Sequence, residues 1–330
     1  REHDGDSRQN MLIFMRALGC PPVRPNIVRA LGQHKDIRAA SALVSALDDS
    51  DPLMRTSAAW ALGELGDAQG VEPLIGALAD SDWCVSAKAA EALGKLGDAG
   101  ALPALLQVLM VNKDSAVGES AVKALGALGP AAIEPLLSIL KNPNVRLRKG
   151  AAQALGRLKD SRAIAPLVQT LDDPDYHVRS AVIEALGQIA DVQVVAPLLL
   201  AVGSRSHRRT ALDALVRLAD VGVVRTARGA VLPIEPLLAA WDAEGSSQTC
   251  ITIARILEQL ADPRTVESLI RALEYPDAKV REHVSAALAQ IGAEAVPPLV
   301  RALDSSEWRV REGAVKALGQ ITDDSRALDA

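Results

Sequence analysis

The side chains of this chain that could do chemistry are mainly cations, and they gather in the middle of the sequence. Several guanidinium and ammonium groups on one surface would bind a phosphate group or an acidic protein surface. Acidic residues between positions 172 and 213 could instead pair with these cations on a solvated face, so both interpretations stay open. The two clusters are Arg146, Arg148, Lys149 and Arg157, and then Arg205, His207, Arg208, Arg209 and Arg217, with Arg225 and Arg228 just beyond.

Patterns that would indicate catalysis or metal binding are weak. Histidine and glutamate are adjacent in Glu2-His3 and Glu282-His283, but neither pair lies in a set with the spacing of a metal site. The chain has no glycine-rich phosphate-binding loop. We therefore predict no catalytic residue, no metal ligand and no cofactor.

Composition excludes several other classes of protein. The 330 residues contain 36 Lys and Arg against 41 Asp and Glu, a net charge of −5, which makes nucleic acid an unlikely partner. Apolar residues make up 49% of the chain but aromatic residues only 2%, as in a stack of thin layers rather than one large core. The chain lacks an apolar run long enough to span a membrane. Three widely separated cysteines indicate a reducing compartment, so we expect a cytoplasmic protein, with Cys84 and Cys250 as small core residues.

A repeat determines the organisation of the chain. The motif Ala-Leu-Gly-x-x-x-Asp recurs, and its aspartate falls at Asp36, Asp67 and Asp98, each 31 residues after the last. A fixed period of this length is typical of a solenoid. Each unit contains a first helix with proline in its first turn, a polar turn that caps the next helix, and a second helix rich in alanine and glycine.

The glycine of the second helix predicts a close helix–helix approach. Glycine inside a helix costs about 1 kcal/mol relative to alanine, so its recurrence implies a geometric need. The recurring positions are Gly32, Gly63, Gly94, Gly126, Gly156, Gly187 and Gly319.

The predicted fold is an all-α, right-handed α-solenoid of about ten stacked antiparallel helix pairs. Residues 1–36 would form a degenerate capping pair, and residues 37–323 would form nine repeat units, with an insertion at 221–231 that forms a protruding loop or an extra helical turn. Residues 324–330 would open a further unit or end as a truncated tail. We expect the chain to be part of a larger polypeptide or complex.

The repeat resembles a known family. Its consensus reads Pro-Leu-x-x-Ala-Leu, then Asp-x-x-Val-Arg, then Ala-Ala-x-Ala-Leu-Gly-x-Leu-Gly-Asp, with its best copies at 67–97, 160–190 and 293–322. This pattern is similar to HEAT repeats, and more narrowly to the short subtype named after phycobilin lyase subunits. The resemblance covers about residues 25 to 323 and implies that the second helices line a concave face.

The solvent positions of the second helices then form a strip of mixed charge. Such a strip suits a protein or peptide partner, whereas a polyanion would require one sign of charge. The insertion adds Arg225 and Arg228 as candidate contacts. The strip consists of Trp60, Glu64, Lys88, Glu91, Lys95, Glu119, Lys123, Lys149, Gln153, Arg157, Glu184, Gln188, Arg209, Asp213 and Arg217.

Tryptophan and arginine positions give further expectations. Trp60 is either a binding hot spot or a ring folded onto the adjacent layer. Trp83 and Trp308 are expected to pack at the turn, and Trp241 in the core. An arginine near the start of the second helix is expected to bridge to the turn aspartate of a neighbouring unit. These arginines are Arg55, Arg146, Arg179, Arg281 and Arg311.

The predicted function is a non-catalytic scaffold that binds a protein or peptide on the concave strip. Two alternatives follow from the resemblance and from the cations. The first is a phycobilin lyase or chaperone-type subunit acting with a partner protein, against which the scarcity of aromatic residues argues. The second is a nucleic-acid or phosphate contact through the central basic clusters.

Overall fold

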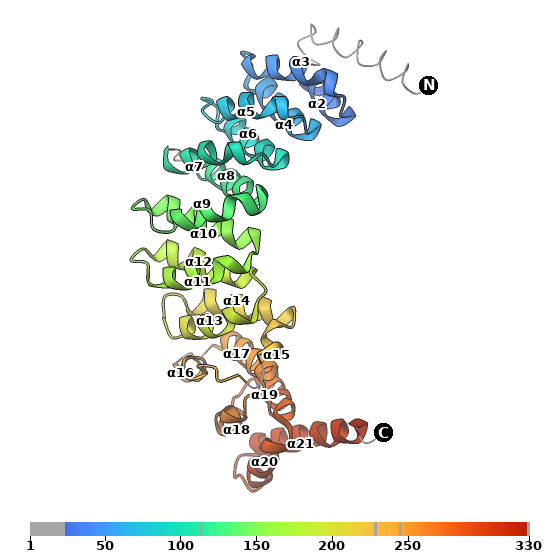
Figure 1. Ribbon diagram of the computed structural model, residues 1–330. Coiled ribbons are helices and arrows are strands. Elements are labelled where there is room, and N and C mark those ends of the chain that lie inside the picture. The colour runs from blue at the N-terminus through green and yellow to red at the C-terminus, as the bar shows by residue number, and fades with distance from the viewer. Residues whose placement is uncertain (1–23, 112–113, 228–229, 244–245, 329–330) are drawn as a thin grey trace, which may run out of the picture. The chain divides into compact units, whose positions relative to one another are not determined.

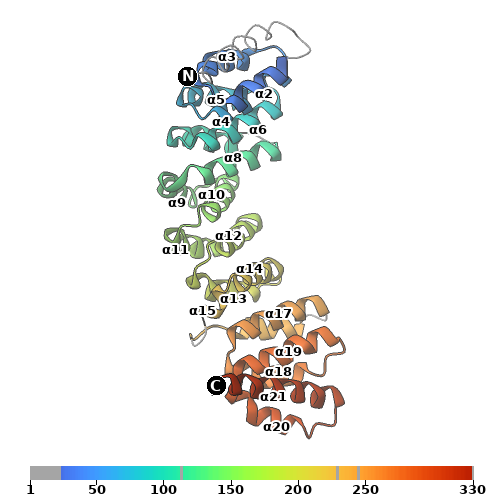
Figure 2. The ribbon, with the colours of Figure 1, turned by 90° about the vertical axis from the view of Figure 1, so that its right-hand side faces the viewer.

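The structure is a computed structural model that describes residues 24–111, 114–227, 230–243 and 246–328. These residues form α-helices and short 3-10 turns, with no strand among them. The chain divides into two compact units between Pro166 and Leu167, and each is a stack of helix pairs (Figures 1 and 2). The prediction of an all-α solenoid is confirmed.

The first unit alternates short first helices with longer second helices. Each second helix packs on the next one, α2 on α4, α4 on α6, α6 on α8 and α8 on α10. The first helices are α3 (Ala40–Ser45), α5 (Val71–Ala77), α7 (Leu102–Val111) and α9 (Ile133–Ile139). The second helices are α2 (Arg24–His34), α4 (Pro52–Leu65), α6 (Trp83–Leu96), α8 (Ser115–Ala127) and α10 (Val145–Leu158). Residues 1–23 of the predicted capping pair lie outside the described residues.

The second unit repeats this arrangement. Its first helices are α13 (Val195–Val202), α16 (Glu235–Ala243), α18 (Val266–Ala272) and α20 (Val296–Ala302), and α11 (Ile164–Gln169) contains the boundary. Its second helices are α12 (Tyr176–Gln188), α14 (Arg208–Asp220), α17 (Ser247–Leu260), α19 (Ala278–Ile291) and α21 (Trp308–Leu328). The insertion contains a short helix, α15 (Val223–Thr226), whose Val224 is buried, so part of the insertion packs as an extra helical turn.

Polar turn residues start the second helices, as predicted. The Asp82 carboxylate accepts a hydrogen bond of 2.8 Å from the backbone N–H of Cys84, and the Asp175 carboxylate accepts one of 2.8 Å from that of His177. These bonds satisfy N–H groups that have no partner within the helix. The same cap is made by Asp51, Asp114, Asn144 and Asp277.

The glycines lie where neighbouring second helices touch, which confirms the predicted close approach. A Cβ atom on Gly63 would lie 2.8 Å from the Cα atom of Ala92, and one on Gly94 would lie 2.8 Å from the Cα atom of Ala124. In the second unit, a Cβ atom on Gly187 would lie 2.6 Å from the Cβ atom of Ala214. A side chain at these positions would push the two backbones apart. By contrast, Gly319 has nothing within 4 Å of its Cβ position.

The last helix, α21, runs past the repeat motif and continues to Leu328. The helices α4 and α6 end on glycines in the left-handed conformation, Gly66 and Gly97. The corresponding residue after α21's repeat motif is Thr322. A β-branched residue strongly disfavours that conformation, so the stop signal is missing.

Three second helices, α2, α10 and α17, end on a left-handed residue that is not glycine, and two of these residues give a stability prediction. Lys159 has a φ angle of 54° and Ala261 one of 49°. Because this conformation costs a residue with a Cβ atom roughly 1 kcal/mol, Lys159→Gly and Ala261→Gly should each raise the free energy of unfolding by about that amount. Urea denaturation measures the change. Gly66→Ala should lower the free energy instead, and equal effects of all three substitutions would contradict this account.

Candidate functional site: the second-helix face

The residues of the predicted strip are solvent-accessible wherever the structure describes them. We call the strip of each unit its second-helix face. In the first unit, Trp60, Glu64, Lys88, Glu91 and Gln153 are half-buried. The side chains of Lys95, Glu119, Lys123, Lys149 and Arg157 are exposed. One row of side chains thus runs over the adjoining helices α4, α6, α8 and α10.

The second unit carries a shorter row. Its members Glu184, Gln188, Arg209, Asp213 and Arg217 are all exposed on α12 and α14, which pack on each other. Two of them, Arg209 and Asp213, also line a cavity of about 690 Å³ between α14 and α17.

The insertion contributes one described candidate. The guanidinium Nε of Arg225, on α15, donates a hydrogen bond of 3.1 Å to the side-chain oxygen of Gln259 on α17. Arg228 lies outside the described residues.

The motif glycines position cations of this face. The Cβ position of Gly126 lies 2.7 Å from the Cβ atom of Arg157 on the next second helix. Equivalent positions bring Lys95 Cδ to 3.6 Å from the Cβ position of Gly63, and the guanidinium of Arg217 to 3.3 Å from that of Gly187. Because glycine has no side chain, the aliphatic part of a long cationic side chain packs beside it, and the charged end of that side chain stays in water.

Charges within the first unit are paired at one end of the face. The Lys95 ammonium forms an ion pair with the Glu64 carboxylate of the preceding second helix, and the Lys88 ammonium lies 2.5 Å from the Glu91 carboxylate. On α8 and α10, by contrast, no ion pair engages Lys123, Lys149 or Arg157 among the described residues. The face therefore divides into a self-neutralised segment on α4 and α6 and a basic segment on α8 and α10.

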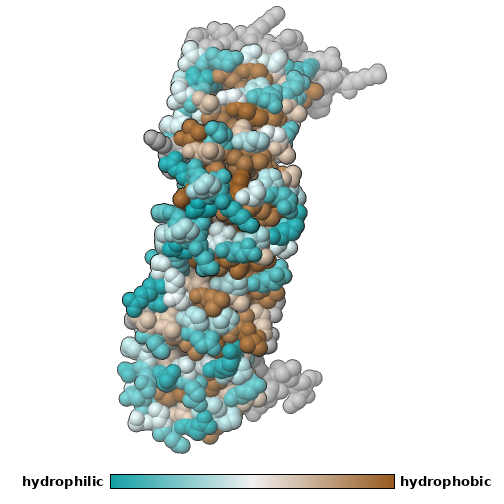
Figure 3. All heavy atoms as spheres, turned by 60° about the vertical axis from the view of Figure 1, so that its left-hand side comes forward, coloured by the Kyte–Doolittle hydropathy of each residue, from teal (hydrophilic) through white to brown (hydrophobic). Residues whose placement is uncertain are grey.

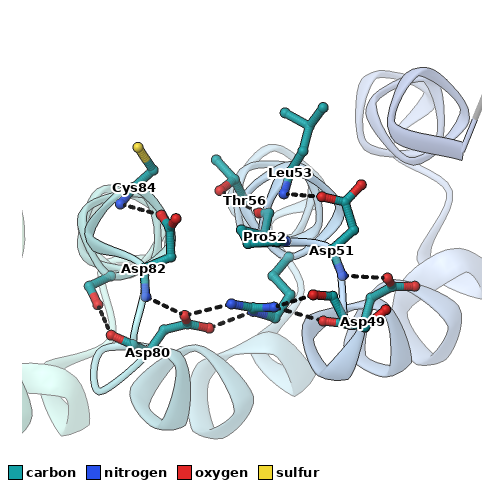
Figure 4. Close-up of polar contacts among 11 residues, drawn as sticks. Asp49, Asp51, Pro52, Leu53, Thr56, Asp80, Asp82 and Cys84 are labelled. Carbon is teal, nitrogen blue, oxygen red and sulfur yellow. Dashed lines mark hydrogen bonds and ion pairs between the residues drawn. The ribbon is translucent and has the colours of Figure 1, made fainter.

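A set of arginines holds the turns and is not available for binding. Arg55 donates bonds of 2.7 and 2.9 Å to the carboxylate of Asp80 in the next unit, and one of 2.8 Å to the carbonyl of Asp49 in its own turn. Figure 4 shows the two turns, with Asp49 and Asp80 joined through the dashed bonds between them. The predicted bridge to a neighbouring turn is thus confirmed at Arg55. Arg179, Arg281 and Arg311 donate to turn carbonyls of their own repeats. Among the described residues these three make no ion pair with a neighbouring turn, so the predicted bridge is not seen for them.

The repeat register assigned to Arg146 is wrong. Arg148 occupies the turn-holding position, is buried, and donates to the carbonyls of Asn142 and Pro143 at 2.8 and 3.0 Å. Arg146 and Arg148 each follow an apolar residue, so the sequence alone did not show which of them occupies the turn-holding position. Counting from the cap resolves it, because Arg55 follows Asp51 by four residues and Arg148 follows Asn144 by four.

The second basic cluster is also smaller than predicted. His207 is 3% exposed and stacks on the Tyr176 ring, with 4.8 Å between ring centroids, and burial lowers the pKa of its imidazole. Arg208 is buried and donates to the carbonyl of Val202 at 3.2 Å. Only Arg205, Arg209 and Arg217 of this cluster are exposed.

Several aromatic and cysteine predictions are corrected. Trp83 and Trp308 are each 53% exposed, more than packing at the turn predicts, and the Arg281 and Arg309 guanidinium carbons lie 5.8 and 5.1 Å from the centroid of the Trp308 ring. Trp241 is half-buried and lines a cavity, so it is not a core residue. Cys250 is buried as predicted, whereas Cys84 is half-buried. Other apolar side chains reach the surface between polar ones, and Figure 3 shows this interleaving on one side of the molecule.

The described residues give no candidate metal centre and no single membrane-spanning helix. Within residues 24–111, 114–227, 230–243 and 246–328, no group of three or more His, Cys, Asp and Glu residues could hold a metal ion. In the same ranges, no single helix has the length and apolar character to cross a membrane. The pair Ala116–Ala127 and Gly129–Ile139, bent by 116°, meets that test by length and composition alone.

Comparison with known families identifies the class of protein. A HEAT-repeat pattern matches residues 12–85, 71–140 and 133–231, and a second HEAT pattern matches 295–325. The pattern of PBS lyase HEAT-like repeats matches 280–305. The chain belongs to the HEAT-repeat family, which confirms the resemblance seen in the sequence. A comparison with curated proteins gives no match.

Solved structures agree on the fold. Importin β is 15% identical with a TM-score of 0.62, and the match covers 92% of this chain and 51% of importin β. Kap95p in its structure with RanGDP is 12% identical with a TM-score of 0.60, over 94% of this chain and 52% of that one. This chain therefore spans about half the length of both proteins. The CpcE–CpcF phycocyanin lyase complex from Nostoc sp. PCC7120 is 24% identical over 76% of this chain and 94% of that chain, but its TM-score is 0.38.

Proposed function

We propose that this chain is a non-catalytic scaffold whose second-helix face binds a protein or peptide partner. The observation that carries the proposal is the basic segment on α8 and α10. Lys123, Lys149 and Arg157 are exposed there, while the lysines of α6 are already paired with glutamates. Cations without an ion pair on a regular helix face provide the charge complementarity that steers and orients an acidic partner.

The chemistry of the segment favours an acidic protein segment over a nucleic acid. The basic segment carries three cations of the strip, and Glu119 lies exposed on α8 as well. A nucleic-acid site gains its affinity from many phosphate contacts and needs a larger basic surface. A partner helix or peptide with two or three carboxylates would match the cations on these two helices. Importin β and Kap95p share the fold, and the Kap95p structure contains a bound protein, RanGDP, which is consistent with a binding role for such a scaffold.

Charge reversal on the basic segment should abolish partner capture. Immobilised wild-type protein is compared with the variant Lys123→Glu, Lys149→Glu and Arg157→Glu, using native lysate and quantitative mass spectrometry. We expect at least about tenfold less of the specific partner on the variant, because each cation becomes a repulsive charge. Capture by the wild type should also fall as salt rises, since exposed charges are screened.

The matched control variant also replaces three cationic residues by glutamate, but at positions in the turns. Lys35, Lys141 and Lys159 are exposed, and they lie in turns between helices. The variant Lys35→Glu, Lys141→Glu and Lys159→Glu should capture the partner as wild type does. Loss of capture in the control but not in the first variant would place the site elsewhere. Capture that nuclease treatment removes would show that nucleic acid, and not a protein, occupies the segment.

A further inference from the structure

A cavity on the first-helix side of the second unit has a composition unlike the rest of the chain. It lies between α16 and α18, has a volume of about 530 Å³, and has the buried Leu257 of α17 in its lining. Trp241 at the end of α16 and Tyr275 in the turn after α18 also line it, and their ring centroids lie 6.4 Å apart at an interplanar angle of 72°. The volume falls in the range of sites that accept a side chain or a small ligand.

Aromatic residues, which are rare in this chain, are concentrated at this cavity. The whole sequence contains four tryptophans and two tyrosines, and one of each lines this cavity. Both rings are only half-buried, so part of each ring surface remains accessible to solvent. The π faces of tryptophan and tyrosine attract cations held within about 6 Å of the ring centroid.

Carboxylates give the cavity an acidic rim. Asp242 and Glu274 line it and are exposed, and no ion pair engages either carboxylate among the described residues. The cation in the described lining is Arg271, whose guanidinium donates to the Ser268 hydroxyl at 3.3 Å. The rim therefore carries one more negative than positive charge, above walls that favour a cation.

We propose that this cavity binds an arginine side chain presented by a partner protein. A guanidinium group is planar, stacks on aromatic faces and forms paired hydrogen bonds with carboxylates, while the methylene stem of arginine packs on apolar walls. The second unit already contains two contacts between a guanidinium and an aromatic ring, because the Arg281 and Arg309 guanidinium carbons lie 5.8 and 5.1 Å from the centroid of the Trp308 ring. An uncharged apolar side chain would leave the two carboxylates unused.

This site does not depend on the proposed function. It lies on the first-helix side of α16 and α18, whereas the second-helix face uses α12 and α14 in this unit. The two sites also call for opposite charges in a partner. A failure of either proposal leaves the other intact.

The test uses the full chain labelled with 5-fluorotryptophan, which gives one ¹⁹F resonance for each of the four tryptophans. The probe is the peptide acetyl-Gly-Gly-Arg-Gly-Gly-amide, and Trp241→Phe assigns the resonance of that ring. We expect the Trp241 resonance to shift and saturate with the arginine peptide, while the other three resonances stay in place. A matched peptide with citrulline, which has nearly the shape of arginine but no charge, should bind at least about fivefold more weakly.

Two variants test the role of the carboxylates. The double variant Asp242→Asn and Glu274→Gln should weaken the arginine peptide at least about fivefold. The control Glu282→Gln and Glu294→Gln removes the same charge from exposed positions outside the cavity and should leave the affinity unchanged. An unmoved Trp241 resonance, an equal shift with citrulline, or equal weakening by both double variants would each overturn the proposal.

Discussion

Replacing Gly63 with alanine should lower the free energy of unfolding by about 2 to 3 kcal/mol. The new Cβ atom would lie 2.8 Å from both the Cα and the Cβ atoms of Ala92. A backbone atom cannot turn aside as a flexible side chain can, so α4 and α6 must separate along their contact. Urea denaturation followed by circular dichroism measures the loss. This cost exceeds the gain of about 1 kcal/mol that alanine brings to a helix interior.

The chain contains its own control for this substitution. Gly319 belongs to the same Ala-Leu-Gly motif on α21, but its Cβ position has nothing within 4 Å. Gly319→Ala should therefore raise the free energy of unfolding by up to about 1 kcal/mol through helix propensity alone. If both substitutions changed stability in the same direction and by the same amount, the motif glycine would not be required for close packing.

Replacing Arg55 with methionine should cost about 2 kcal/mol of stability, because several hydrogen bonds to a charged group are lost. The guanidinium of Arg55 joins its own turn to Asp80 of the next unit, and both side chains are more than four-fifths buried. Methionine keeps the volume of the stem, so the measured change reports the polar contacts. Arg38→Met is the control, since the Arg38 side chain is about half exposed and bonds to Asp36 two residues away.

The contribution of Arg55 should depend on pH in a defined direction. The hydrogen bond from Arg55 lowers the pKa of the Asp80 carboxyl below its ordinary value of 3.8, against the opposing effect of burial. A lowered folded-state pKa means that the pair stabilises the protein fully above that ordinary value. The contribution is lost as the pH falls through the folded-state pKa. The stability difference between wild type and Arg55→Met should stay constant from about pH 7 to pH 5 and shrink below about pH 4. A difference that grew on acidification would contradict this assignment.

The repeat was predictable because its motif contains residue types, such as glycine, that strongly affect backbone conformation and helix stability. Glycine lowers the stability of a helix interior, so its recurrence at Gly63 and Gly94 predicted that neighbouring helices pack closely there. The structure shows this contact. The Lys95–Glu64 ion pair was also within reach, since the two residues are 31 positions apart and thus occupy one position in successive units.

Other features depend on register and burial that the motif does not encode. Val145 and Leu147 are both apolar, and only the structure shows that Leu147 is buried while Val145 is exposed. That difference assigns the turn-holding role to Arg148. The burial of His207 was hidden in the same way, because a histidine stands where Val178 stands in the preceding repeat. The cavity of Trp241 and Tyr275 joins residues 34 positions apart in two different repeats, and no motif marks it.

The motif glycines connect the fold to the proposed function. By omitting a side chain, Gly126 lets α10 approach α8 and leaves room for the stem of Arg157. The same residue type that sets the spacing of the stack thus fixes a cation on the second-helix face. Positions elsewhere on the helices can vary without disturbing the stack, and this freedom allows a common scaffold to present different partner-binding residues.

Site-specific photo-crosslinking tests the central claim most directly. A photoreactive benzoylphenylalanine replaces Gln153, which lies on the second-helix face of α10, or Gln107, an exposed residue of the first helix α7. Irradiation in native lysate should join a partner protein to the chain labelled at position 153 and not to the chain labelled at position 107. The additional changes Lys123→Glu, Lys149→Glu and Arg157→Glu should remove that adduct. An adduct from position 107 without one from position 153 would show that the partner binds the opposite side of the helix pairs.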